Sequence, residues 1–252
     1  MTAESLGNAA LSDWRTVQPP ELSDGAVHVW RIRLDRESTP DDWAVLSAGE
    51  VARARRFFAE HHRRRYVIAH AVLRRVLATY AGVSASMLQF TAGEFGKPAL
   101  NAASAPGLLE FNLSHSAERA LVAVSRRAVG VDVEQWDVEV EHINLAERFF
   151  SPAERAALRQ LTTSPEQVVA GFFAAWSRKE AYLKASGHGI TRGLHHFDVT
   201  LTPGEPARLL ADRIEHGAEL RWTMTALLVD AGYSAAVVAA APVQEILLFN
   251  AE

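Results

Sequence analysis

The segment Val129-Gly130-Val131-Asp132-Val133-Glu134 constrains this chain more than any other, because its valines alternate with a glycine and two acids. Side chains alternate between the two faces of a β-strand, so a strand here places Asp132 and Glu134 together on one face. Two carboxylates this close repel each other unless a cation lies between them, and hard divalent cations such as Mg2+ prefer carboxylate oxygens. The pattern indicates either a metal site or an ordinary polar strand face.

Composition limits the remaining options. The 252 residues suffice for one large domain or two ordinary halves. The absence of cysteine excludes disulfides, a thiol nucleophile and thiolate metal ligands. With 26 basic and 30 acidic residues the net charge is -4, so no general affinity for nucleic acid is expected. No export signal is visible, and the apolar run 235–243 is too short to cross a bilayer. We therefore expect a soluble, cytoplasmic protein without a membrane partner.

Periodicity predicts an α+β chain whose second half repeats the order of the first. In the first half, helical periodicity begins at Ser47 and Glu50 and continues to about Tyr80. Alternation predicts strands at 26–34, 88–90, 109–113 and 120–124. In the second half, the predicted helices begin at the capping box 151–154 and at about 167, and the predicted strands lie at 129–134, 197–201, 220–229 and 233–240.

This repetition suggests two similar α+β halves with pseudo-twofold symmetry, 1–128 and 129–252, although no sequence period accompanies it. Clefts between such units are favoured ligand sites. Because the carboxylates of the opening strand follow the proposed boundary, we predict that the active site lies at the interface.

The segment Trp176-Ser177-Arg178-Lys179-Glu180-Ala181-Tyr182-Leu183-Lys184 supplies a second candidate group. Glu180 and Lys184 are four residues apart in a helical pattern and therefore share a face. An acid and a base side by side suit proton transfer, but an ordinary surface ion pair has the same spacing.

Positive charge is concentrated in one region despite the acidic balance of the chain. The arginines of this region are Arg53, Arg55, Arg56, Arg63, Arg64, Arg65, Arg74 and Arg75. Guanidinium groups match phosphate oxygens in pairs, so a phosphate pocket is one interpretation. A solvated helix face and a nucleic-acid patch are the alternatives, and the scarcity of interleaved aromatic residues disfavours the latter.

The segment Phe111-Asn112-Leu113-Ser114-His115-Ser116 places hydroxyls and an imidazole where a predicted strand reaches a turn. Ser114 and His115 can donate to a phosphate, and a hydrogen-bonded turn explains them equally well. The chain has no Walker phosphate loop, Rossmann glycine fingerprint or Ser-His-Asp hydrolase spacing.

Taken in order, F-N-L-S-H-S, V-G-V-D-V-E, R-F-F-S-P-x-E and W-S-R-K-E-A-Y-L-K resemble the motifs of the 4'-phosphopantetheinyl transferase superfamily. The chain most resembles the monomeric type that activates surfactin synthetase. The resemblance extends from about Arg53 to Gly189 and includes Gly96-Lys97-Pro98. The ordered set is far more specific than any single motif.

The resemblance implies transfer of the phosphopantetheine arm of coenzyme A to a serine of an acyl or peptidyl carrier protein, with release of 3',5'-ADP. By family analogy, Asp132, Glu134 and Glu154 would hold Mg2+, or Mn2+, against the pyrophosphate of coenzyme A. Glu180 would be the general base that takes the serine proton, directly or through water. Lys184 would stabilise the pyrophosphate and can protonate the departing phosphate.

The resemblance also implies contacts to coenzyme A. Arg53, Arg65 and His115 match contacts to the 3'-phosphate, Ser114 matches a pyrophosphate contact, and Gly96, Lys97 and Pro98 match the adenine side. Two positions depart from the family pattern: Tyr66 stands where relatives can carry a small hydroxyl residue, and Glu50 where some carry a basic one.

The expected partners are coenzyme A and a carrier protein, with no nucleic acid and no membrane, and a pseudo-dimeric chain can act as a monomer. A noncatalytic coenzyme A or nucleotide sensor is the competing class. Binding without turnover would favour the sensor, and salt-sensitive binding to arbitrary RNA would favour a nucleic-acid module.

Overall fold

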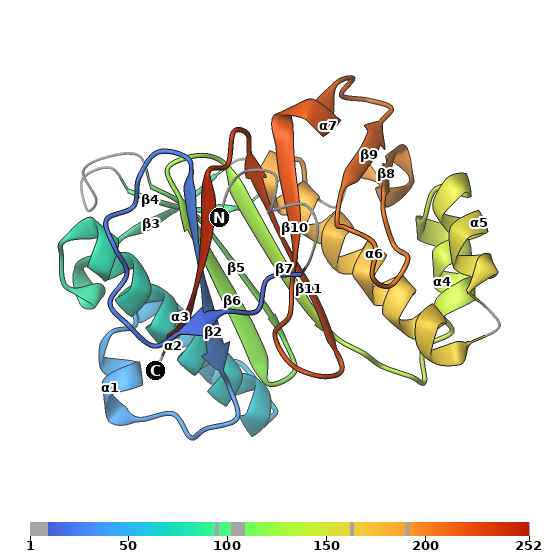
Figure 1. The fold of residues 1–252 in the computed structure, drawn as a ribbon. Helices are drawn as coiled ribbons and strands as arrows, with labels where there is room; N and C mark the ends of the chain where they lie inside the picture. The colour runs from blue at the N-terminus through green and yellow to red at the C-terminus, as the bar shows by residue number, and fades with distance from the viewer. Residues whose placement is uncertain (1–9, 94–95, 102–108, 162–163, 190–191, 252) are drawn as a thin grey trace.

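The computed structural model describes residues 10–93, 96–101, 109–161, 164–189 and 192–251 (Figure 1). The helices are α1 (Pro40–Ala44), α2 (Ala48–Arg55), α3 (Glu60–Ala81), α4 (His142–Phe149), α5 (Pro152–Gln160), α6 (Pro165–Ser186) and α7 (Ala218–Arg221), with 3-10 turns η2 (Ala85–Met87) and η5 (Leu194–His196). The strands of the first half are β1 (Trp14–Arg15), β2 (Ala26–Arg33), β3 (Phe90–Ala92), β4 (Pro98–Leu100), β5 (Glu110–Ser116) and β6 (Arg119–Ser125). The remaining strands are β7 (Val129–Gln135), β8 (Phe197–Val199), β9 (Leu209–Asp212), β10 (Trp222–Leu227), β11 (Tyr233–Ala240) and β12 (Glu245–Ala251).

The order of elements repeats along the chain, which confirms the α+β class. Helices α3 and α6 each contain 22 residues, and each ends at a left-handed glycine, Gly82 or Gly187. A 3-10 turn and a short antiparallel strand pair follow each helix: β3 with β4, and β8 with β9. A twofold axis relating the halves, and the boundary at 128/129, remain predictions.

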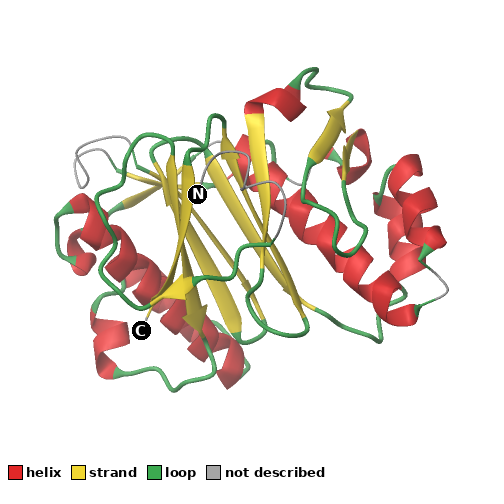
Figure 2. Cartoon of the chain, viewed as in Figure 1, coloured by secondary structure: helices red, strands yellow, loops and turns green. Residues whose placement is uncertain are grey.

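Two sheets lie side by side between the helices (Figure 2). The five-stranded sheet has the order β1-β12-β2-β6-β5, and the three-stranded sheet has the order β10-β11-β7. The last strand, β12, thus pairs with β1 and β2 of the first half. Figure 1 shows α3 on the outer side of the first sheet and α6, with α4 and α5 beyond it, on the outer side of the second.

Strand β7 confirms the alternation predicted from its sequence. Val129, Val131 and Val133 are fully buried in a core that the two sheets share. Gly130 lies on the other face, where α6 crosses the strand so closely that a Cβ would overlap the α6 backbone at Ala181. The glycine is therefore needed for close packing, and this packing brings α6 against the face that carries the acidic residues.

The prediction of one helix from Ser47 to about Tyr80 is wrong, because the chain turns between α2 and α3. Phe57 lies in this turn and packs its ring against Tyr66, with 5.4 Å between ring centroids. Burying an aromatic ring between the two helices explains the break. The capping box of Ser47 and Glu50 is confirmed.

The strand predicted at 220–229 is shorter than expected, because α7 occupies residues 218–221 and the strand runs from Trp222 to Leu227. Among the described residues, no helix is both long and apolar enough to span a membrane.

Candidate active site

The seam between β5 and β7 is held together by side chains of β5. Asn112 accepts a hydrogen bond from the Val131 backbone N–H at 2.9 Å. Ser114 donates to Asp132 at 2.7 Å, and Ser116 donates to Glu134 at 2.9 Å. Three alternate residues of β5 thus hydrogen-bond to β7 and hold both of its carboxylates in place.

Asp132 is 2% exposed, and its two carboxylate oxygens differ in their hydrogen bonds. Oδ1 accepts hydrogen bonds from Ser114 and, at 2.6 Å, from the Lys184 ammonium of α6. Oδ2 is buried and has no hydrogen-bond partner among the described residues. A buried carboxylate oxygen without a donor is unfavourable by itself, so this atom is suited to a cation.

Negative charge accumulates around Asp132. Burial and then the charge of Asp132 raise the pKa of Glu134 to about 7. Burial also raises the pKa of Glu180, and the charge of Asp132 adds to that effect. Glu180 therefore lies within electrostatic reach of both strand carboxylates, and Lys184 partly offsets their charge.

The predicted acid–base pair of α6 lines a pocket of about 320 Å3. Glu180 and Lys184 form one wall, and the predicted Gly96-Lys97-Pro98 segment forms part of another. Lys97 donates to the Val129 backbone carbonyl at 3.0 Å, which ties this segment to the start of β7. The two groups of residues, more than 80 positions apart in sequence, thus meet at one cavity.

A second pocket of about 660 Å3 lies beside the first and shares Pro98 and Asn112 with it. Its wall includes Arg53, whose guanidinium stacks over the Tyr66 ring at 5.6 Å from the centroid. Glu50 also lines this pocket, so both departures from the family pattern lie at its wall.

The remaining predicted phosphate ligands lie near the end of β5. Partial burial, followed by the positive charges of Lys184, Arg65 and His62, lowers the pKa of His115. Such mutual repulsion indicates a place where an anion would be stabilised. Arg65 also forms an ion pair with Glu118 at 2.5 Å, so part of its charge is already compensated.

Glu154, which was predicted to join Asp132 and Glu134 around a metal, lies in a hydrogen-bonded environment of its own. Both of its oxygens are committed elsewhere: Oε1 accepts from Lys179 and the Val199 N–H, each at 2.8 Å, and Oε2 accepts from the Ser151 N–H at 2.9 Å. These partners are Lys179 of α6, Val199 of β8 and the N-cap residue of α5, Ser151, and none of them belongs to the β5–β7 seam. Across the described ranges, no three His, Asp or Glu side chains are arranged to hold a metal.

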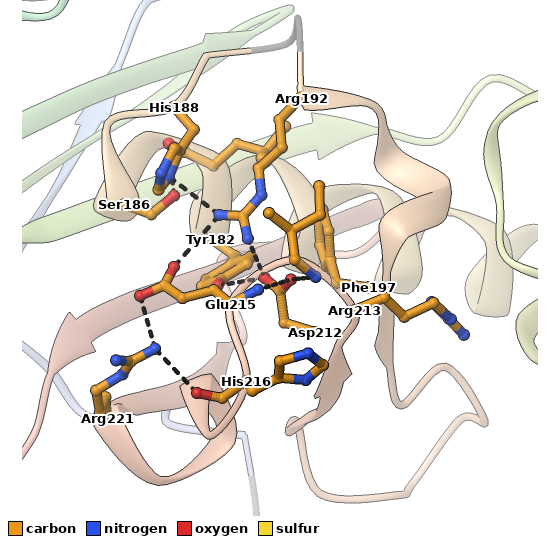
Figure 3. A network of polar contacts seen from close by, with 12 residues as sticks. Tyr182, Ser186, His188, Arg192, Phe197, Asp212, Arg213, Glu215, His216 and Arg221 are labelled. Atoms are coloured by element: carbon orange, nitrogen blue, oxygen red, sulfur yellow. Dashed lines mark hydrogen bonds and ion pairs between the residues drawn. The ribbon is translucent and has the colours of Figure 1, made fainter.

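The loop after α6, which contributes Gly187 and Gly189 to the smaller pocket, is anchored by the polar network in Figure 3. Asp212 accepts hydrogen bonds from Tyr182 at 2.7 Å and from Arg192 at 2.6 Å. Arg192 also contacts Glu215 at 3.4 Å. The network thus joins α6, the loop and the end of β9.

Sequence reasoning missed Asn112, Ser116 and Gly130 as parts of the site. The polar residues Asn112, Ser114 and Ser116 alternate with the same period of two that identified β7. This alternation could have shown that all three side chains share one face of a strand. Close helix packing at Gly130 depends on a contact between distant segments and has no local signature.

Comparisons with known proteins agree with this arrangement. Residues 128–238 match the 4'-phosphopantetheinyl transferase superfamily, and residues 37–127 match the family described as 4'-phosphopantetheinyl transferase, N-terminal. The 4'-phosphopantetheinyl transferase HetI of Nostoc sp. strain PCC 7120 is 43% identical over 197 residues, which cover 76% of this chain and 82% of the relative. The 4'-phosphopantetheinyl transferase Sfp of Bacillus subtilis strain 168 is 28% identical over 221 residues, covering 85% and 92%. The resemblance inferred from the motifs is thereby confirmed: the chain belongs to the 4'-phosphopantetheinyl transferase superfamily and is an enzyme of this type.

Proposed function

We propose that the enzyme moves the 4'-phosphopantetheine group of coenzyme A to a serine of an apo acyl or peptidyl carrier protein. The serine Oγ forms a bond to the phosphorus next to pantetheine, and the bond from this phosphorus to the oxygen of the departing 3',5'-ADP breaks. One observation carries the proposal: Lys184 of α6 reaches Asp132 of β7 beside a pocket that also contains Glu180.

A divalent cation fits the residues present. Asp132 offers a buried oxygen without a partner, and Glu134 has its pKa raised to about 7 beside it. These two carboxylates would hold Mg2+, or Mn2+, in place of the proposed trio with Glu154. When bound, the ion would offset the charge that develops on the pyrophosphate oxygens.

Glu180 is the proposed general base. Burial raises the pKa of this carboxyl above its usual value, which strengthens it as a proton acceptor while Lys184, one helical turn later, offsets the charge. Lys184 is the proposed donor to the departing phosphate. Its ammonium already contacts both Ser114 and Asp132, at 3.0 and 2.6 Å, so it is oriented before substrate binds.

Coenzyme A is a long ligand, and two adjoining pockets suit it. We place the pyrophosphate at Lys184, which lines the smaller pocket, and at Ser114, which accepts from the Lys184 ammonium, because both residues contact the carboxylate that would face the metal. Gly96, Lys97 and Pro98 would contact the adenine side, where Pro98 borders both pockets. Arg53, Arg65 and His115 would contact the 3'-phosphate, and the Arg65 guanidinium would then be shared with Glu118.

The proposed site lies between segments of the proposed halves 1–128 and 129–252. Since β5 and Lys97 come from the first and β7 and α6 from the second, one chain supplies every group named above. We therefore propose that the enzyme acts as a monomer.

The proposal is tested by incubating the purified chain with coenzyme A, Mg2+ and a panel of acyl and peptidyl apo-carriers. Mass spectrometry should show one phosphopantetheine group on the carrier serine. Asp132→Asn, which keeps shape but removes the charge, should slow transfer by more than about 100-fold. Glu219→Gln, at an exposed carboxylate of α7, is the matched control and should retain full activity.

Coenzyme A binding without transfer to any carrier would instead support the noncatalytic sensor. Full activity in Asp132→Asn would contradict the role given to that carboxylate.

A further inference from the structure

Phe58 is 104% exposed, which makes it the most exposed large apolar side chain among the described residues. Its neighbour Phe57 packs against the buried Tyr66, so the turn between α2 and α3 directs one ring inward and presents the other to solvent. A single exposed apolar residue is common and needs no explanation. The charges around Phe58 give it significance.

Uncompensated positive charge surrounds Phe58. Arg55 and Arg56 are exposed, and no ion pair or hydrogen bond joins either side chain to another residue that the structure describes. Further along α3, by contrast, Arg63 pairs with Glu60, and Arg64 contacts Glu118. The positive charge of the turn is thus left open in a chain whose net charge is -4.

The exposed turn adjoins the larger pocket, because Arg53, which lines that pocket, lies in the last turn of α2 together with Arg55. His61 and His62 lie in the first turn of α3 and are exposed, with 4.1 Å between their ring centroids. The charge of His62 reaches His115, whose pKa is also lowered by Lys184 of the active site. We define the Phe58 patch as Arg55, Arg56, Phe58, His61 and His62.

We infer that the Phe58 patch is the docking surface for an acidic face of the carrier protein, with Phe58 inserting into an apolar recess between the acidic side chains. The inference rests on the proposed function, which requires a macromolecule to bring its serine to the pocket. A bulky aromatic anchor among arginines has the composition of an interaction hot spot, and its charge attracts an acidic partner. Single-stranded nucleic acid fits less well, because binding it requires several aromatic rings for successive bases.

The experiment compares Phe58→Ala and the double variant Arg55→Glu/Arg56→Glu with wild type. Steady-state transfer gives the KM for the apo-carrier and, separately, the KM for coenzyme A, and anisotropy of a labelled apo-carrier gives its Kd. Leu220→Ala on α7, at a side chain 82% exposed, is the control for loss of an exposed apolar group. None of these side chains is buried, so the variants should fold.

We expect each patch variant to raise the carrier Kd and KM by about tenfold or more, while the KM for coenzyme A and the Leu220→Ala parameters stay unchanged. Raising the salt concentration should weaken carrier binding in wild type more than in the charge-reversed variant. Transfer with an unchanged carrier KM in the variants would overturn the docking inference and leave the proposed function intact. If carrier binding depends on the patch but no transfer occurs, the docking inference stands and the proposed function is wrong. If the patch variants raise only the KM for coenzyme A, the docking inference is also wrong. It is wrong as well if these variants lose binding to an RNA oligonucleotide while carrier binding stays unchanged.

Discussion

The buried ion pair between Glu154 and Lys179 allows a direct test of whether Glu154 has a structural or a metal-binding role. Lys179 is 0% and Glu154 is 2% exposed, and the ammonium also donates to the Leu194 and Phe197 carbonyls at 2.8 and 2.6 Å. Replacing Glu154 with Gln preserves its shape but leaves a buried cation without a counter-charge. The new amide NH2 would also face a donor where the carboxylate accepted a hydrogen bond.

Removing one partner of a buried pair costs about 3–5 kcal/mol of unfolding free energy. For a chain of this size that corresponds to a fall in Tm of roughly 6–20 °C. Urea unfolding of Glu154→Gln, Lys179→Met and the double variant measures this cost, and the double variant should lose about 2 kcal/mol less than the sum of the single losses. Glu50→Gln is the matched comparison, because Glu50 pairs with buried Arg74 at 2.7 Å but is more exposed.

The same variants separate structure from metal binding. If Glu154 is structural, folded Glu154→Gln should need the same Mg2+ concentration for half-maximal transfer as wild type, assayed well below its Tm. Stability within 1 kcal/mol of wild type, together with a clearly higher Mg2+ requirement, would refute the reasoning and restore Glu154 as a metal ligand.

Three further outcomes follow from the geometry. Burial raises the pKa of Glu134 from 4.5 to about 7, so over this interval the folded state holds a proton that the unfolded state has lost, and the metal-free protein should lose stability as the pH rises. In urea unfolding with a chelator, Glu134→Gln should remove this part of the pH dependence. Gly130→Ala should cost about 3 kcal/mol or more and reduce transfer, because the new Cβ overlaps the α6 backbone. Gly49→Ala, whose Cβ would meet only the Ser47 Oγ at 4.0 Å, should be neutral or stabilising in the same thermal melts. Asp212→Asn should cost about 3 kcal/mol, because Arg192 is 4% exposed and loses its main partner, and hydrogen exchange should quicken in the loop after α6; unchanged exchange would argue against this anchor.

Local patterning explains why part of the fold could be predicted. The period of two in Val129–Glu134 and the capping boxes at Ser47 and Ser151 depend on neighbouring residues, and the structure has both features. The break between α2 and α3 depends on where Phe57 packs after folding, so helical periodicity alone gave one helix. The pairing of β12 with β2 joins positions about 220 residues apart and leaves no local signal.

Sequence spacing can place two side chains that one element holds, but it cannot give the environment of a side chain that several elements surround. Glu180 and Lys184 share a helix face, and their common pocket follows from the spacing. Glu154 opens a helix within a capping box, as Glu50 does, and this pattern alone cannot show that a lysine will occupy the carboxylate. The repeated order offered a clue: Arg74 and Lys179 are each the fifteenth residue of a 22-residue helix, and each binds the capping glutamate of the helix before it.

The order of elements therefore repeats along the chain, but the residues on the corresponding strands differ in chemistry. Strand β7 carries Asp132 and Glu134 on the face covered by α6, and β5 supplies the hydroxyls that hold them. The last strand, β12, takes an equivalent place in the order of elements, yet the side chains it turns toward the α3 core are Leu247, Phe249 and Ala251. An apolar face of this kind can stabilise a core but cannot bind a cation or a pyrophosphate. Of these two strands only β7 carries a pair of carboxylates, so the proposed function predicts one reactive seam in each chain, between β5 and β7, and one bound coenzyme A.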